Sequence, residues 1–328
     1  MSRQARAVLD RLPPHATMGV GSLPGGDPDA AVRHVMESYD IPFCPQLPAL
    51  DGNMIDEWLG VPPGRCGWSP ERDRKQARAW DAFLAAVGAT PPGHSVVKLQ
   101  VTGPVTLCWA LEERGSEPAV MFARDVAEWL ASSVRPQIDA LSDRGMDCLL
   151  VVDEPALDLL PVRRGLVEAW EPLRRVGSAW GLHLCCAPPW KLVEEASPDF
   201  LNIDLVHHPL DDKATVSLGN LLRTGTTVAW GVTPTSAVGG PAIATRTLEG
   251  AIAQVVGRGL DQDDVARRSV LTASCGTGAN SLREESSVAA TLRCVAAIAS
   301  QRAGESLMAH DESKGREWSG VAGVDHKP

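Results

Sequence analysis

Short apolar runs alternate with longer amphipathic segments along most of this chain. Each run is rich in apolar or β-branched residues and is followed by Gly, Pro or Asp, a pattern typical of a buried strand that ends in a turn. The runs predict strands at residues 18–23, 42–47, 95–101, 148–153, 182–187, 200–205, 227–232 and 269–275. Helical periodicity is clearest at residues 28–39, 71–87, 122–145, 248–260 and 282–303.

This alternation predicts an α/β fold with a parallel sheet, and eight strands indicate closure into a single-domain (β/α)8 TIM barrel. A doubly wound sheet is the alternative, but the glycine-rich segment at residues 19–26 lacks the GxGxxG spacing. We expect an N-terminal extension at residues 1–16, the barrel at 17–303 and a mobile C-terminal tail at 304–328, which is polar and aperiodic.

Composition excludes some classes of partner. The formal charge of −10 argues against nucleic acid, which needs a basic face. No run approaches the roughly 20 apolar residues that span a membrane, and the first 16 residues lack the apolar core of a secretory signal. The eight cysteines follow no compact framework of spacings. We therefore expect free thiols, possible metal ligands and a cytoplasmic protein.

The most informative chemical feature is the pair His183 and Cys185. Alternate residues of a strand point to one side, so both side chains can converge on one interior point, whereas Cys186 points the other way. Imidazole and thiolate are ligands that suit zinc. Cys275 ends the last predicted strand, and strand ends meet at the catalytic face of a barrel. The alternative is that these residues are ordinary core cysteines and a chance histidine.

A fourth metal ligand is expected from the end of the sixth strand. Asp204 ends that strand and could supply a carboxylate oxygen, and we favour it. His207 and His208 follow in the loop and are the competing candidates.

Other candidate residues lie at the ends of earlier strands. Asp153 and Glu154 could bind a substrate ammonium group or relay a proton, although an aspartate there could equally cap a turn. Gly103 and Ser22 lie in turns where a substrate could approach the backbone closely, or which could be plain loops. We expect catalytic roles for Asp153 and Glu154, and substrate binding by Ser22, Gly103 and Asp153.

Several motifs together resemble the catalytic barrel of cobalamin-independent methionine synthase. The chain is most similar to short, single-barrel relatives in the uroporphyrinogen decarboxylase/methionine synthase superfamily, and the resemblance covers about residues 17–303. The motifs occur in the family's order: GVGSLP, PQLP, KLQVTGPVTL, VVDEPAL, HLC, NID, WGVTPTS and SCGTG.

The resemblance implies a zinc-dependent methyltransferase. It places the zinc on His183, Cys185, Asp204 and Cys275, although the full-length synthases usually carry Glu where this chain has Asp204. It also implies that Asp153 binds the amino group of homocysteine. The acceptor would be a small thiol and the donor methyltetrahydrofolate or a methyl-corrinoid protein.

Three departures separate the chain from the full synthase. It is too short for the second, N-terminal barrel, and residues 232–237 lack the family's proton-donating histidine. Residues 47–54 lack the glutamate that helps to hold the amino acid. The alternatives are another zinc-dependent thiol alkyltransferase of the coenzyme M type, a non-catalytic thiol- or pterin-binding barrel, and a porphyrinogen-type decarboxylase. The last would need arginines that the predicted strand ends do not supply.

Overall fold

The computed structural model describes residues 1–59, 77–89, 95–114, 123–159 and 165–318, with side chains described up to residue 302. Its centre is a curled, seven-stranded parallel sheet in the order β1-β7-β6-β5-β4-β3-β2. The strands are β1 (Ala16–Thr17), β2 (Val96–Thr102), β3 (Asp147–Asp153), β4 (Ala179–Leu184), β5 (Phe200–Asp204), β6 (Thr227–Thr233) and β7 (Ser269–Ala273).

The sheet differs from the expected eight strands at the first two predicted strands, residues 18–23 and 42–47. Segment 42–47 forms no named strand, and β1 ends at Thr17; beyond it, isolated parallel bridges join Met18 to Ile41 and Ser22 to Gln46. A third bridge joins Phe43 to Lys98 of β2. Pro42 and Pro45 lack amide hydrogens, which prevents a continuous ladder in this segment.

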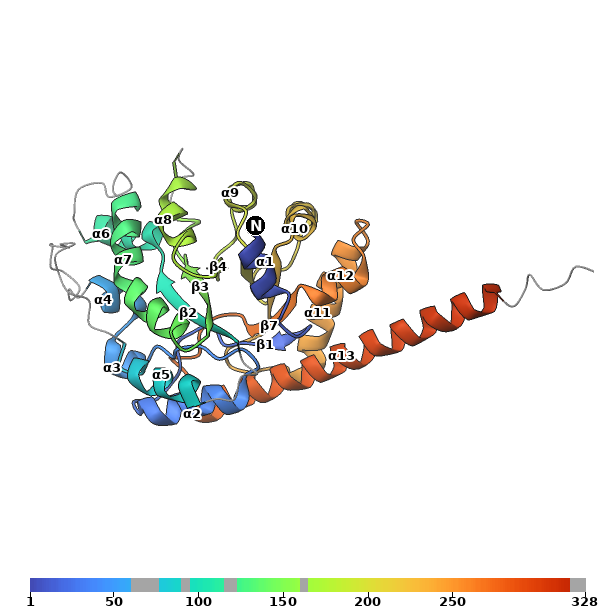
Figure 1. Cartoon of the computed structure of the whole chain (residues 1–328), viewed down its shortest axis with the longest axis horizontal. Helices are drawn as coiled ribbons and strands as arrows, with labels where there is room; N and C mark the ends of the chain where they lie inside the picture. Colours follow the sequence, from blue (N-terminus) through green and yellow to red (C-terminus); the bar gives the residue numbers. More distant parts are fainter. Residues whose placement is uncertain (60–76, 90–94, 115–122, 160–164, 319–328) are drawn as a thin grey trace, which may run out of the picture.

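Helices surround the sheet (Figure 1). They are α1 (Arg3–Leu9), α2 (Pro28–Ser38), α3 (Pro48–Asp51), α4 (Met54–Leu59), α5 (Trp80–Ala89), α6 (Pro104–Glu113), α7 (Ala123–Ser142), α8 (Glu171–Arg174), α9 (Trp190–Ala196), α10 (Asp212–Thr224), α11 (Gly240–Val256), α12 (Gln262–Arg267) and α13 (Leu282–Trp318), with a 3-10 turn η2 at Glu168–Trp170. A helix occurs in each of the five predicted segments, but α5 begins only at Trp80 although 77–79 are described, and α11 ends at Val256 rather than at residue 260. Residues 71–76 and 122 of the predicted segments lie outside the described residues.

Strand alternation divides the apolar side chains between two cores. On β3, Leu150 and Val152 belong to the core between the sheet and the outer helices, whereas Leu149 and Val151 point inside the curl. The inner core also contains Phe200 of β5 and the apolar face of α1. The same alternation places Asp153 inside the curl and Glu154 outside it.

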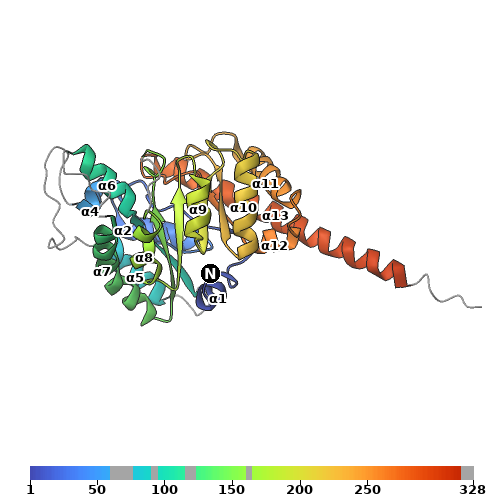
Figure 2. The same ribbon diagram turned by 90° about the horizontal axis from the view of Figure 1, so that it is seen from above.

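The N-terminal residues are part of this packing. Helix α1 lies across the middle of the ring of helices (Figure 1) and buries Ala5, Val8 and Leu9 against the strands. At the other end, α13 keeps a helical backbone to Trp318, beyond residue 303, and projects past the other helices in both views (Figures 1 and 2). The helical backbone thus continues through residues 304–318, where the polar, aperiodic sequence predicts a mobile tail. The domain boundaries stay predictions.

We expect Leu9→Ala to destabilise the fold by about 2–4 kcal/mol, since it leaves a cavity in the inner core. Leu9 is only 3% exposed. Gln4→Ala, at an exposed position of the same helix, is the control and should change stability by less than about 0.5 kcal/mol. Denaturant unfolding measures both, and equal effects would contradict the packing role of α1.

Within the described residues, no helix is long and apolar enough to cross a membrane.

Candidate metal centre

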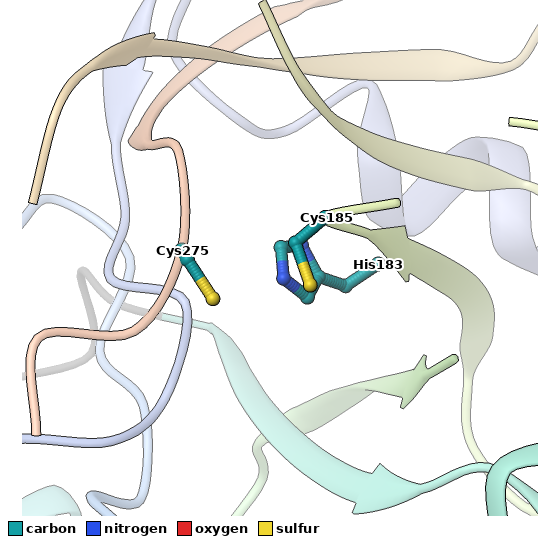
Figure 3. A group of neighbouring side chains, drawn as sticks. All are labelled: His183, Cys185 and Cys275. Atoms are coloured by element: carbon teal, nitrogen blue, oxygen red, sulfur yellow. The ribbon is translucent and has the colours of Figure 1, made fainter. Parts of the chain in front are cut away.

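His183, Cys185 and Cys275 come together at the carboxyl end of the sheet. His183 lies on β4 and points inside the curl, Cys185 follows β4, and Cys275 follows β7. One potential ligand atom of each residue lies within 4.8 Å of the others. Figure 3 shows the three side chains facing one another. The predicted convergence of these three residues is confirmed.

The imidazole of His183 has one occupied and one unoccupied nitrogen. Its Nδ1 lies 2.7 Å from Oδ1 of Asn202. Its Nε2 is buried and makes no hydrogen bond of ordinary geometry within the described residues. Burial lowers the pKa of His183, but the neighbouring Cys275 sulfur and Asp153 raise it, and the net direction is upward. A buried nitrogen without a partner costs free energy unless something else binds it, so Nε2 is suited to a metal.

The two cysteines differ in acidity. A hydrogen bond from Cys185, together with the nearby His183, lowers the pKa of Cys275, despite burial. The same hydrogen bond, together with burial, raises the pKa of Cys185, because a second negative charge would lie beside the first. Two cysteine sulfurs and an imidazole form a donor set that fits zinc.

Asp153 lines the same cavity. Burial raises its pKa to about 6, against the charges of His183 and Lys98, which lower it. Its Oδ1 has no hydrogen-bond partner among the described residues. A buried carboxylate oxygen that faces a cavity is suited to binding a cationic group.

The cavity has a volume of about 100 Å³ and lies next to the metal-ligand group. Ser22 lines it and connects to the loop after β7: its hydroxyl accepts a hydrogen bond from the amide of Gly278 at 3.3 Å. At Gly276 an added Cβ would lie 2.1 Å from the Ser22 hydroxyl, so any larger residue would displace that hydroxyl. The structure thus brings Ser22 to the cavity, as expected for a substrate-binding residue.

Several cavity residues were missed in the sequence. They are polar residues that come from β2, the segments before it and α7: Gln46, Glu57, Gln100 and Gln137. Gln100 could have been found by alternation along β2, because Val96, Lys98, Gln100 and Thr102 share one face. Glu57 and Gln137 lie on helices, where nothing local marks them.

Lys98 lies buried near the cavity and was also missed. Its ammonium group donates to the carbonyl oxygen of Val20 and lies 3.3 Å from Oε1 of Gln100. Burial lowers its pKa to about 8, although the charge of Asp153 acts in the opposite direction. An internal cation near Asp153 favours the ionised form of that carboxyl group.

Asp204, predicted as the fourth ligand, is not part of this group. Its Oδ1 accepts from the amides of Val206 and His207 at 2.8 and 3.0 Å, and its Oδ2 lies 2.6 Å from Nδ1 of His207. Both oxygens are therefore occupied by its own loop, in the turn geometry that short aspartates favour.

Glu154 and Gly103 also lie away from the cavity lining. The Glu154 carboxylate points outside the curl and accepts from the Thr106 amide at 2.7 Å, at the start of α6. It fills the space beside Gly103, where a Cβ would lie 2.0 Å from the carboxylate carbon. We expected Glu154 to act in catalysis and Gly103 to contact the substrate. Neither residue lines the cavity in which a substrate would bind.

Comparison with known proteins gives a likeness of fold. No family model matches the chain, and no curated protein matches it in sequence. A solved structure of a B12-independent methionine synthase from Shewanella sp. W3-18-1, in complex with selenomethionine, is similar with a TM-score of 0.64. The match covers 88% of this chain and 98% of that one, at 14% sequence identity. At this identity the likeness shows that this chain shares a TIM-barrel-like α/β fold with that enzyme.

Proposed function

We propose that this protein is a zinc-dependent methyltransferase that transfers a methyl group to a thiol, with homocysteine as the leading acceptor. The observation that carries the proposal is the convergence of His183, Cys185 and Cys275, with an unpartnered buried Nε2 among them. The fold shared with a B12-independent methionine synthase supports the reaction class.

His183 Nε2 and the sulfurs of Cys185 and Cys275 would hold the zinc. When bound, zinc lowers the pKa of a thiol that joins it, from about 8.5, so that the thiolate forms at neutral pH. As a fourth protein ligand, Asp204 would first have to give up its contact with His207.

The remaining residues bind and orient the acceptor. Asp153 faces the cavity with an oxygen that lacks a partner and would hold the ammonium group of homocysteine. Ser22 would contact the same substrate from the opposite loop. The acceptor sulfur forms a bond to the methyl carbon as the bond from that carbon to the donor breaks.

The identity of the donor decides whether a proton is needed. When methyltetrahydrofolate is the donor, its tetrahydrofolate part leaves readily only if the nitrogen that carries the methyl group is protonated. A methyl-corrinoid donor needs no such acid. The loop after β6 carries Pro234 and Ser236 in the segment where the methionine synthase family has a proton-donating histidine. We therefore propose both methyltetrahydrofolate and a methyl-corrinoid as possible methyl donors. The methyl-corrinoid would be carried by a partner protein.

The proposal also covers architecture and compartment. Residues 41–46, bridged to both neighbouring segments, would take the eighth position of a closed barrel. A reducing cytoplasm would keep Cys185 and Cys275 as thiols.

Two measurements test this function. Purified protein should contain one zinc per chain, and zinc-edge absorption should gain one zinc–sulfur contact when homocysteine is added. Methyl transfer is then assayed with methyltetrahydrofolate and methylcobalamin, against homocysteine and coenzyme M. Turnover only with coenzyme M would replace homocysteine as the acceptor. Tight thiol or pterin binding without any turnover would identify a non-catalytic binding protein, and the absence of zinc would sink the proposal.

A further inference from the structure

Asn202 lies inside the curl of the sheet, next to His183 on the adjacent strand. It is 1% exposed, and its side-chain amide has partners on three strands. Its Nδ2 donates to the carbonyl oxygen of Ala229 on β6 at 3.0 Å and to the hydroxyl of Thr272 on β7 at 2.8 Å. Its Oδ1 lies 2.7 Å from Nδ1 of His183 on β4.

These partners fix which way the amide faces. A backbone carbonyl oxygen can only accept a hydrogen bond, so the NH2 group of Asn202 must face Ala229. The oxygen Oδ1 therefore faces His183 and can only accept there. Nδ1 of His183 must carry the proton that is donated to it.

The position of this proton determines what the other nitrogen can do. A neutral imidazole carries one proton, so a proton on Nδ1 leaves a lone pair on Nε2. Nε2 is the buried nitrogen without a partner that belongs to the group with the two cysteines.

We propose that Asn202 is a positioning residue that holds His183 in the Nδ1-protonated tautomer, so that Nε2 is directed to the metal. The part that concerns zinc rests on the proposed function, whereas the tautomer does not. Thr272 of β7 anchors Asn202, and Cys275 follows the same strand, so one hydrogen-bonded chain links the strands that carry His183 and Cys275.

The polar character of this position is a further argument. On the same inner face of β5, Phe200 belongs to the inner apolar core, and an apolar side chain at 202 would continue it. A buried amide is costly unless all of its groups are bonded, and here both donors and the acceptor are bonded. Packing alone does not require such a side chain.

The first experiment determines the tautomer without zinc. In apo protein with 15N-labelled histidine, we expect an exchange-protected Nδ1–H signal from His183, assigned by its loss in His183→Gln. The signal should be lost or should exchange rapidly in Asn202→Leu. An Nδ1 without a proton in the wild type would overturn the inference, whether or not the protein binds zinc.

The second experiment measures zinc affinity by chelator competition. Asn202→Leu should weaken binding about 10–100-fold, the range for the loss of an outer partner of a metal-binding histidine. Asn202→Asp keeps an acceptor for Nδ1–H, although its second carboxylate oxygen would face the Ala229 carbonyl oxygen, so it should bind zinc more tightly than Asn202→Leu. Thr272→Val is the matched control: it removes one bond of the amide but leaves the Ala229 carbonyl to orient it, so affinity should change less than about threefold.

The variants also separate positioning from stability. Asn202→Leu and Thr272→Val should both lower the melting temperature, but only the first should weaken zinc binding. Wild-type affinity in Asn202→Leu, or an equal loss in both variants, would overturn the inference and leave the proposed function standing. A wild type that binds no zinc would overturn the proposed function, and the histidine spectrum would still decide the tautomer.

Discussion

Cys185→Ser and Cys275→Ser are each expected to weaken zinc binding by on the order of a hundredfold, and the double variant should lose stoichiometric zinc. A complete four-ligand zinc site contributes about 10–16 kcal/mol, so one ligand corresponds to roughly 3 kcal/mol, or about two powers of ten in affinity. Serine keeps the shape of cysteine but supplies no thiolate. Metal content after dialysis and chelator competition measure the effect.

Cys186→Ser is the matched control for this loss. Cys186 adjoins Cys185 in sequence but points outside the curl, where its thiol lies 3.5 Å from the Glu154 carbonyl oxygen. Its replacement should leave the zinc content unchanged. Added zinc should also raise the melting temperature of the wild type and of Cys186→Ser, since a ligand that binds only the folded state stabilises it. If Cys186→Ser lost zinc as completely as Cys185→Ser, the assignment of ligands would be wrong.

The metal-ligand group could be predicted because its signals are local. A strand over residues 182–187 would put the side chains of His183 and Cys185 on one face. Strand β4 ends at Leu184, yet Cys185 directly after it still lies beside His183. Cys275 required one further assumption, that parallel strands end at the same edge of the sheet. The parallel pairing that runs from β4 through β5 and β6 to β7 confirms that these strands end at one edge.

The role of Asp204 could not be predicted from the local sequence. Its strand and its inward direction follow from alternation, yet its carboxylate oxygens are bonded to the loop that follows. Whether an aspartate reaches a neighbouring strand or turns back to its own backbone depends on the loop conformation, which the strand pattern does not contain.

The first two predicted strands show a second limit of prediction from the sequence. The apolar runs at residues 18–23 and 42–47 are as clear as those of the central strands, but both form only isolated bridges, and Pro42 and Pro45 interrupt the second run. Counting apolar runs overestimates regular strands where Pro interrupts the amide pattern. By contrast, α10 was missed although its signals are present, since Asp211 caps its first turn and Gly225 ends it in the left-handed region.

Glu154→Ala should destabilise the protein by about 4–5 kcal/mol, a large effect for one side chain. The carboxylate accepts from the amides of Val105 and Thr106, from the Thr106 hydroxyl and from Nε1 of Trp170, at 2.7 to 3.1 Å. Removing it leaves these buried donors without partners, at about 1–3 kcal/mol each, less what entering water recovers. Denaturant unfolding measures the loss.

Gly103 supplies an internal check on this role. Gly103→Ala places a Cβ 2.0 Å from the Glu154 carboxylate carbon, so the single variant should also be strongly destabilised. In the Glu154→Ala background the obstructing carboxylate is gone, and the same change should cost much less. A double-mutant cycle should therefore give a favourable coupling of about 1–3 kcal/mol between the two substitutions. Simple additivity would show that the two residues do not interact as described.

The Glu154 site should also shape the pH dependence of stability. Burial raises the pKa of Glu154 to about 7, although hydrogen bonds from Trp170 and Thr106 act in the opposite direction. Its pKa in the unfolded chain is about 4.3, so between these values the folded protein retains a proton that the unfolded chain releases. The free energy of unfolding should therefore fall as the pH rises through this window. In Glu154→Gln, which cannot ionise, this part of the slope should disappear; an unchanged slope would mean that Glu154 is already ionised at the lower pH.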